Sequence, residues 1–323
     1  KVITADAIKN SFLGISQQSR SLFTIFAEHN MKVKALINQD FAAGTLERYE
    51  TVLKHLKEFV KSKYHLTDFF VADVDNEFIH EFDYYLRAVR HCENNTTVKY
   101  LKNFKKIIRI ALSNGWITKD PFINYKVKLK KIDRGFLTQE ELEIISQKSF
   151  STPRLNQIKD AFLFQCYTGL AYADIKKLRR DQIISGADGE LWINTKRMKT
   201  DTTVNVPLLP EALAIMNKYE NHPQCCNNGL LLPVLSNQKM NAYLKEIADL
   251  CGINKNISSH LARHTFATTV TLANGISLEA VSKMLGHTNL NTSRIYARML
   301  DSRVSDEMKA LKSKMSLKVV KSA

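Results

Sequence analysis

The sequence predicts a mainly helical protein with one small β-sheet, an α+β fold. Apolar residues recur at helical spacing through most of residues 21–114, with capping residues at several helix starts. Strand-forming residues are concentrated in 181–208. With 323 residues, the chain is long enough for two domains that each bury a core. We therefore expect a helical N-terminal domain followed by a mixed domain.

The N-terminal part is expected to form four helices joined by short connections. Their apolar positions follow helical spacing, and the residues between them include breaks such as Gly44 and the cap sequence at Asp73. The four predicted segments are 21–38, 45–64, 73–90 and 94–114. Helices of this length with short connections are typical of a small bundle.

Two of these helices carry basic faces in a chain with a net charge of +15, from 47 basic and 32 acidic residues. Such a balance favours a polyanionic partner, most simply nucleic acid, although an individual lysine face is often only solvated. The candidate phosphate contacts are Lys54, Lys57, Lys99, Lys102 and Lys106. No run of about 18 apolar residues is available for a membrane span.

The C-terminal part begins after a basic, extended linker. Thr138 and Glu141 form a capping box, and residues 155–168 form an apolar helix. Residues 191–194 and 204–208 are expected to pair as strands around a turn. Two further helices are expected at 210–219 and 236–251, with 222–228 as a loop between them.

The stretch from Ile257 to Met299 carries His260, Arg263, His287 and Tyr296. His260 and Arg263 lie three residues apart on a predicted helix capped by Ser258 or Ser259, so they share one face. A guanidinium matches phosphate oxygens, the histidines can donate hydrogen bonds or move a proton, and an activated tyrosine can act as a nucleophile. No carboxylate cluster accompanies them, so the pattern predicts phosphoryl transfer to tyrosine without a metal or another cofactor.

Simpler interpretations exist for each residue taken alone. An isolated histidine or tyrosine is usually a packed or solvated helix residue. His260 and His264 have the spacing of zinc ligands, but no glutamate lies between them and no third ligand is evident. The order and spacing of all four residues together favour the catalytic interpretation.

The motifs resemble those of the tyrosine recombinase (phage integrase) family, in the sequences HLARH at 260–264 and LGH at 285–287, followed by Tyr296. The resemblance covers roughly residues 20–300. It implies a SAM-like core-binding domain at 21–120, a linker at 121–134, a catalytic domain at 135–300 and a tail helix at 301–323. Residues 1–20 are then a linker or the remnant of a missing N-terminal arm-binding domain.

One family position departs from the pattern. The stretch Tyr167 to Ile175 resembles the family's first box, which normally places a catalytic arginine where this chain has Ala171. In lacking that arginine the sequence resembles integrases of Bacteroides-type conjugative transposons. Lys159 is the leading substitute, ahead of Lys176 and Arg154, and an ordinary surface lysine is the alternative interpretation.

The resemblance also implies a general acid in the predicted hairpin. Lys199 lies seven residues before Val206 of the Val-Pro-Leu sequence, at the position that resembles the family's hairpin lysine. Lys196 and Arg197 are close rivals, and a turn lysine is ordinarily only solvated.

We therefore interpret the chain as a site-specific recombinase that cleaves double-stranded DNA at a crossover site through a 3′-phosphotyrosine. The resemblance implies a homo-tetramer on two DNA sites, with DNA-bending or directionality factors as further partners. Five cysteines without a CxxC pair indicate reduced thiols and a cytoplasmic protein, and the resemblance to a DNA recombinase implies association with the nucleoid. Two alternatives remain open: a catalytically impaired DNA-binding regulator of a mobile element, which Ala171 favours, and a relaxing topoisomerase of type IB.

Overall fold

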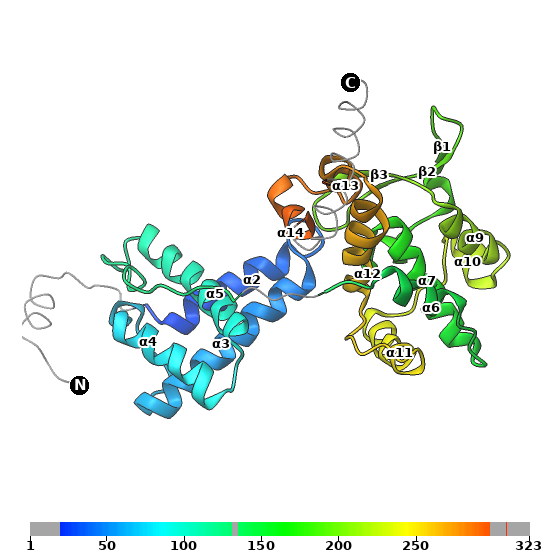
Figure 1. Ribbon diagram of the computed structural model, residues 1–323. Coiled ribbons are helices and arrows are strands. Elements are labelled where there is room, and N and C mark those ends of the chain that lie inside the picture. The colour runs from blue at the N-terminus through cyan, green and yellow to red at the C-terminus, as the bar shows by residue number, and fades with distance from the viewer. Residues whose placement is uncertain (1–19, 131–134, 298–307, 309–323) are drawn as a thin grey trace, which may run out of the picture. The chain divides into compact units, whose positions relative to one another are not determined.

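The computed structural model describes residues 20–130, 135–297 and 308 (Figure 1). Its contacts divide the chain into two compact units, Lys1–Ile132 and Asp133–Ala323. The first unit is built from helices, and the second combines helices with one three-stranded sheet. The predicted α+β class, mainly helical with a small sheet, is confirmed. The predicted N-terminal linker and C-terminal tail helix lie outside the described residues, except for Arg20 and Met308.

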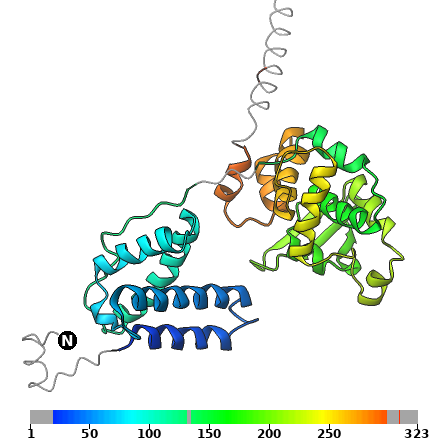
Figure 2. The same ribbon diagram turned by 90° about the horizontal axis from the view of Figure 1, so that it is seen from below.

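Unit 1 is a bundle of helices whose longest members agree with the predicted segments. Helices α2 and α3 lie side by side and α5 packs against both (Figures 1 and 2). The elements are α2 (Leu22–Ala35), α3 (Ala43–Tyr64), η1 (Val71–Asp73), α4 (Asn76–Tyr84), η2 (Tyr85–Val89) and α5 (Asn94–Ser113). The predicted helix at 73–90 corresponds to α4 and the π-helical end that continues it, together spanning 76–89, and a separate 3-10 turn precedes them.

An aromatic cluster holds this bundle together. Phe59 of α3 lies 5.2 Å from Phe78 and 5.4 Å from Phe82 of α4, measured between ring centroids. Phe104 of α5 meets Phe82 edge-to-face at 5.8 Å. All four rings are almost fully buried. Each such side chain contributes roughly 1.5–3 kcal/mol by burial, so the cluster dominates the packing of α3, α4 and α5.

The segment that leaves this bundle is held to the start of α5. Asn95 donates from Nδ2 to the carbonyl of Lys130 at 2.8 Å and accepts from the Lys130 N–H at 2.8 Å. Asn94 donates to the carbonyl of Lys128 at 3.1 Å. These bonds fix an extended run whose lysines at 126, 128 and 130 are exposed.

Unit 2 contains the capped helix, the hairpin and the helical elements that the sequence predicted, together with elements that it did not predict, among them α8, β1 and α10. Its first elements are α6 (Gln139–Gln147), α7 (Pro153–Thr168), α8 (Tyr172–Lys177), η3 (Arg180–Gln182), β1 (Ile183–Ser185), β2 (Leu191–Lys196) and β3 (Thr203–Pro207). The later ones are α9 (Pro210–Lys218), α10 (Pro223–Asn228), α11 (Asn237–Leu250), α12 (Ser259–Thr265), η4 (Phe266–Thr271), η5 (Leu272–Asn274), α13 (Leu278–Met284), η6 (Leu290–Thr292) and α14 (Arg294–Ala297). The predicted loop at 222–228 is wrong, because Pro223 starts a short helix there with its fixed φ at the first helical position.

The sheet is antiparallel in the order β1-β2-β3. Ile193 pairs with Val206, and both side chains are buried against the helices. The next residues on these strands, Asn194 and Asn205, pair with each other and join their side chains at 2.9 Å on the more exposed face. This alternation fixes the register, so the turn that joins β2 to β3 is fixed as well.

Helix α7 is the central element of unit 2, and α12 packs against it. Ser259 at the start of α12 donates to Gln165 of α7 at 2.7 Å, and both are buried. At the end of α7, Gly169 has φ +70°, and a Cβ atom there would lie 2.4 Å from the ring of Phe266. Only glycine allows this close approach, which brings the end of α7 to the side of α12 that carries Arg263.

Among residues 20–130 and 135–297, no helix combines the length and apolar character that crossing a membrane requires.

Candidate active site

The structure brings Arg263, His287 and Tyr296 together on unit 2. Arg263 lies on α12, His287 follows α13 after Leu285 and Gly286, and Tyr296 lies on α14. The rings of His287 and Tyr296 are stacked, with centroids 6.4 Å apart and an interplanar angle of 9°. Nη2 of Arg263 lies 3.2 Å from Nε2 of His287. Three residues that are distant in sequence therefore share one site.

His260 lies at the exposed edge of this group. Its ring is 4.8 Å from that of His264, which is buried and in turn meets the Tyr296 ring edge-on at 5.1 Å. The row of rings connects the protein surface to the buried tyrosine, which is only 3% exposed. Within the described residues, no group of three or more His, Cys, Asp or Glu side chains is arranged to hold a metal ion.

Arg263 is a buried cation that is held by carbonyl groups. It is 4% exposed, and it donates from Nη1 to the Gly169 carbonyl at 2.6 Å and from Nη2 to the Leu285 carbonyl at 2.5 Å. In the described part of the chain, no carboxylate lies within ion-pair distance of it. Burial, and then the charge of Arg197, lower the pKa of Arg263 to about 10, while contacts with Tyr296 and Asp174 act in the opposite direction. Arg263 therefore stays charged at neutral pH.

His287 is neutral, and its contacts define its tautomer. Burial, and then the charges of Arg263 and Arg197, lower the pKa of His287 to about 4. A guanidinium can only donate, so Nε2 of His287 accepts from Arg263. The imidazole proton then lies on Nδ1 and is donated to Oγ of the buried Ser293 at 2.7 Å. This pair of contacts fixes the ring plane against Tyr296.

The turn before His287 is built around glycine and a second arginine. Gly286 has φ +60°, and a Cβ atom there would lie 2.6 Å from Val204 and 2.7 Å from Cδ of Arg197. Nη1 of Arg197 donates to the Gly286 carbonyl at 3.3 Å. The β2–β3 hairpin therefore packs directly on the turn that positions His287.

The same hairpin carries Lys199, the predicted general acid. Lys199 and Lys196 are exposed, and Lys196 lies 3.7 Å from Asp201 as an ion pair. The hairpin backbone is fixed by Asp174 of α8, whose Oδ1 accepts from the Met198 N–H at 2.9 Å. The structure thus places Lys199 on a tethered turn, without a contact to the buried group in the described residues.

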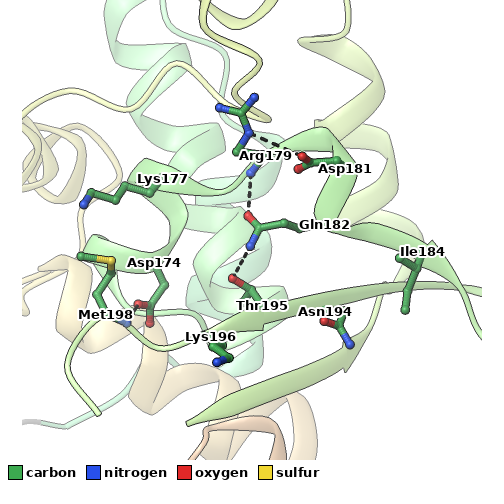
Figure 3. Close-up of a pocket in the computed structure, with 10 residues that line it drawn as sticks. All are labelled: Asp174, Lys177, Arg179, Asp181, Gln182, Ile184, Asn194, Thr195, Lys196 and Met198. Atoms are coloured by element: carbon green, nitrogen blue, oxygen red, sulfur yellow. Dashed lines mark hydrogen bonds and ion pairs between the residues drawn. The ribbon is translucent and has the colours of Figure 1, made fainter. Parts of the chain in front are cut away.

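A pocket of about 550 Å³ lies beside this hairpin, and Figure 3 shows Asp174 next to Met198 on one side of it. On the other side the Gln182 amide accepts from the Arg179 N–H at 2.9 Å and donates to Thr195 at 2.8 Å (Figure 3). None of the five predicted catalytic residues lines this pocket. Its polar bonds stabilise the base of the hairpin.

Lys159 does not join the site. Its Nζ donates to the carbonyls of Ser146 and Lys148, at 3.1 and 2.7 Å, and so caps the end of α6. Lys159 lies about 15 Å along α7 from Gly169, given a rise of about 1.5 Å per residue. Ala171, the position that it was expected to compensate, is the N-cap residue of α8 and offers only a methyl group.

The five predicted DNA-contacting lysines are all exposed on unit 1, where Lys54 and Lys57 lie on α3 and the other three on α5. Lys99, Lys102 and Lys106 follow one another at helical spacing, so they form a single stripe on α5. Lys106 also lies 5.7 Å above the ring of Tyr49. Unit 1 therefore presents a basic helix face.

Three residues of the buried group were not predicted as part of it. His264 could have been found from its spacing of four residues after His260 on one helix face. Arg197 was considered only as a rival to Lys199, and Ser293 carries no signal in the sequence. Together the group offers a buried cation, a neutral imidazole and a tyrosine hydroxyl, which suits attack on a phosphate.

Two family models match the chain. A phage integrase SAM-like domain matches residues 21–139, and the phage integrase family matches residues 135–303. Tyrosine recombinase XerD of Listeria innocua serovar 6a is 27% identical over 288 residues, covering 85% of this chain and 94% of that protein. Tyrosine recombinase XerC of Roseiflexus sp. (strain RS-1) is 24% identical over 278 residues, covering 81% and 85%.

Solved structures share the fold. A lambda integrase dimer bound to a COC′ core site has a TM-score of 0.69 at 17% identity, covering 86% of this chain and 95% of that chain. A lambda integrase tetramer bound to a Holliday junction has a TM-score of 0.68 at 16% identity, covering 87% and 81%. The Tn1549 transposon integrase with circular intermediate DNA has a TM-score of 0.67 at 14% identity, covering 86% and 95%.

Proposed function

The chain belongs to the phage integrase family of tyrosine recombinases, and from that premise we propose how its site cuts and rejoins DNA. It is a tyrosine-type site-specific DNA recombinase, and its substrate is double-stranded DNA containing a crossover site. We assign residues 21–120 to core binding, 121–134 to the linker and 135–300 to catalysis. Because its substrate is DNA, we propose that the protein acts in the cytoplasm, on the nucleoid.

The burial of Arg263 carries the proposal. The Arg263 guanidinium is 4% exposed and donates to two carbonyls and an imidazole, so it loses its hydration, and in the described residues no carboxylate lies within ion-pair distance of it. Such a charge is costly unless an anion completes its surroundings. A phosphate is the anion that a guanidinium fork matches best, and the tyrosine hydroxyl already lies beside that fork.

In the proposed reaction Tyr296 attacks the scissile phosphorus. Its Oη forms the new P–O bond while the bond from phosphorus to the 5′-oxygen breaks, leaving a 3′-phosphotyrosine and a free 5′-hydroxyl. The tyrosine proton passes to His260 at the exposed edge of the site, and Lys199 gives a proton to the departing 5′-oxygen. Arg263 binds the non-bridging oxygens, where negative charge accumulates, and His287 holds the Arg263 guanidinium in position through its Nε2.

The phosphotyrosine conserves the energy of the phosphodiester. A 5′-hydroxyl from a partner strand can therefore reseal the break without ATP or a metal ion. We propose a homo-tetramer on two DNA sites as the assembly, in keeping with the lambda integrase tetramer on a Holliday junction. Accessory factors that bend DNA or set direction belong to the same proposal. The lysine stripes on α3 and α5 supply phosphate contacts that do not depend on base sequence.

The test is covalent trapping on a defined duplex. The full chain with Tyr296→Phe first selects its binding site from a randomised duplex pool, because this variant cannot cut. The selected site is then nicked near the crossover point, so that the cleaved end diffuses away and the adduct accumulates. Wild type should form a metal-independent adduct on a denaturing gel, and Tyr296→Phe should form none.

Other outcomes identify the alternatives. Binding of the selected duplex without an adduct would favour an impaired DNA-binding regulator. An adduct with plasmid relaxation but no exchange between two sites would favour a topoisomerase.

A modified substrate tests the role of Lys199 separately. Sulfur in place of the bridging 5′-oxygen gives a leaving group that needs no protonation. Lys199→Ala should lose about 10²–10⁴-fold in cleavage rate on the ordinary duplex, as expected for loss of a general acid, and recover on the sulfur-containing one. Lys196→Ala, which removes another exposed lysine from the same hairpin, should leave both rates within about twofold of wild type. Equal defects of Lys199→Ala on both substrates would refute the general-acid assignment.

A further inference from the structure

The proposed reaction leaves the site short of positive charge. The transition state carries two negative non-bridging oxygens, and burial keeps His287 neutral. Among the residues predicted to be catalytic, Arg263 is then the buried permanent cation. We propose that Arg197, from the β2–β3 hairpin, is a second catalytic arginine that binds the scissile phosphate. This inference rests on the proposed function and adds a residue to its site.

The two arginines donate hydrogen bonds to consecutive carbonyl groups of the turn that precedes His287. Arg263 donates to the carbonyl of Leu285 at 2.5 Å, and Arg197 donates to the carbonyl of Gly286, the next residue, at 3.3 Å. His287 follows directly, with its Nε2 at 3.2 Å from Arg263. The hairpin thus delivers a second guanidinium to the same turn. Its charge is close enough to act on both Arg263 and His287.

Arg197 is the hairpin cation that points inward. Its side chain is 14% exposed, whereas Lys196 and Lys199 on either side of it are exposed. The aliphatic part of Arg197 packs on Gly286, where any Cβ atom would collide with it. A cation that served only solubility would lie exposed, as Lys196 and Lys199 do. The burial of Arg197 therefore favours a role for its charge in the site.

Asp174 lies beside the Arg197 guanidinium but accepts no hydrogen bond from it. Nε of Arg197 lies 4.0 Å from Oδ2 of Asp174, beyond hydrogen-bond distance, and both atoms are buried without a hydrogen-bond partner among the described residues. The other carboxylate oxygen is engaged by the Met198 N–H. Nη1 is used by Gly286, and in the described part of the chain Nη2 donates no hydrogen bond. Nη2 is therefore the nitrogen of Arg197 that we assign to a phosphate oxygen.

Neither Ala171 nor Lys159, the leading predicted substitute, supplies a cation to this site. Ala171 begins α8 two residues after Gly169, whose carbonyl binds Arg263, so its methyl group lies beside the site and cannot donate. Lys159 is occupied at the end of α6. Asp174, three residues after Ala171, is the residue that reaches across to Arg197. The hairpin thereby supplies the charge that the start of α8 lacks.

The first experiment compares cleavage of the nicked duplex by wild type, Arg197→Ala, Arg197→Lys and the control Lys196→Ala. Removing one preorganised donor to a transition-state oxygen costs about 10²–10³-fold in rate, which is the loss expected for Arg197→Ala. Arg197→Lys keeps the charge but loses the fork, so it should retain part of the activity. Lys196→Ala, adjacent and exposed, should stay within about twofold of wild type. Thermal unfolding and duplex binding by each variant report whether the fold and the DNA contacts survive.

The second experiment removes the charge from the substrate instead. A methylphosphonate at the scissile position replaces one charged oxygen with a methyl group, so a second cation is no longer needed. Cleavage by Arg197→Ala should recover to within about tenfold of wild type on this duplex. Lys199→Ala should not recover, because its 5′-oxygen still needs a proton.

Each outcome decides between the two proposals. Normal cleavage by Arg197→Ala, or an equal defect on both substrates, would overturn the role of Arg197 and leave the recombinase assignment intact. An Arg197→Ala protein that does not fold is replaced by Arg197→Lys, whose defect must likewise shrink on the methylphosphonate. Failure of wild type to cut a bound duplex would overturn the proposed function itself.

Discussion

The lowered pKa of His287 predicts how the free energy of unfolding depends on pH. In an unfolded chain its pKa is 6.5, and burial next to Arg263 and Arg197 lowers it to about 4 in the folded protein. That difference corresponds to about 3 kcal/mol in favour of the neutral imidazole, at about 1.4 kcal/mol for each pKa unit. Because the side chain is only half-buried, solvent screening reduces the usable figure to about 1–2 kcal/mol.

The sign follows from proton binding. Above pH 6.5 the imidazole is neutral in both states, so His287 adds no pH dependence to the free energy of unfolding. Between pH 6.5 and about 4 the unfolded chain binds a proton that the folded protein excludes. The free energy of unfolding therefore falls as the pH drops through this window, and it falls no further below about pH 4.

Two measurements check this prediction. Side-chain NMR of the histidines, with His287 assigned by its absence in His287→Gln, should show a midpoint near pH 4 in the folded protein. Urea unfolding at about pH 7.5 and about pH 5 should show a steeper loss in wild type than in His287→Gln. The other histidines contribute to both proteins, so their effects cancel in the difference.

The neighbouring arginine supplies the control. Arg197→Gln removes one of the cations that depress ionisation, so the midpoint of His287 should rise. Lys196→Gln, at an exposed lysine already paired with Asp201, should leave it unchanged. A wild-type midpoint at or above 6.5 would refute the buried, cation-flanked environment described for His287.

Three further predictions concern the supports of the site and the DNA surface. Gly286→Ala should lower the free energy of unfolding by about 3 kcal/mol, against about 1 kcal/mol for Gly275→Ala. Both glycines have positive φ, but a Cβ atom meets Arg197 and Val204 only at position 286, so equal losses in urea unfolding would contradict the packing. Ser293→Ala leaves the Nδ1 proton of His287 without its buried acceptor and should cost about 1–2 kcal/mol in the same assay. Retained stability would mean that this contact does not hold the ring. Replacing the α5 lysines at 99, 102 and 106 together should weaken binding equally across DNA sequences and reduce the slope of log K against log salt by about 3. An unchanged slope would remove α5 from the DNA interface.

The long helices could be predicted from the sequence because their signals are local. Asn94 to Ser113 repeats apolar positions on one face and basic positions on another, and the capping box at Thr138 marks a helix start. The division near residue 85 was missed because it depends on a backbone bond from Arg90 to the Tyr85 carbonyl, which forms only as the chain packs. Such a π-helical end leaves no periodic signal in the sequence.

The site shows the same division between local and distant information. His260 and Arg263 share a helix face, so their proximity follows from spacing alone. Arg197 meets Gly286 across 89 positions in the sequence, and Arg263 meets Gly169 across 94. Those contacts depend on how the hairpin and α7 pack on the last helices, and no pattern within either segment specifies that packing.

The central claim is that Tyr296 becomes covalently linked to DNA, and mass spectrometry of the trapped adduct tests it most directly. The adduct from wild type and the nicked duplex is digested with nuclease and trypsin, and the modified peptide is sequenced. We predict a nucleotide attached through its 3′-phosphate to the tyrosine of the tryptic peptide spanning residues 295–298. A nucleotide on any other residue, or linkage through a 5′-phosphate, would contradict the account.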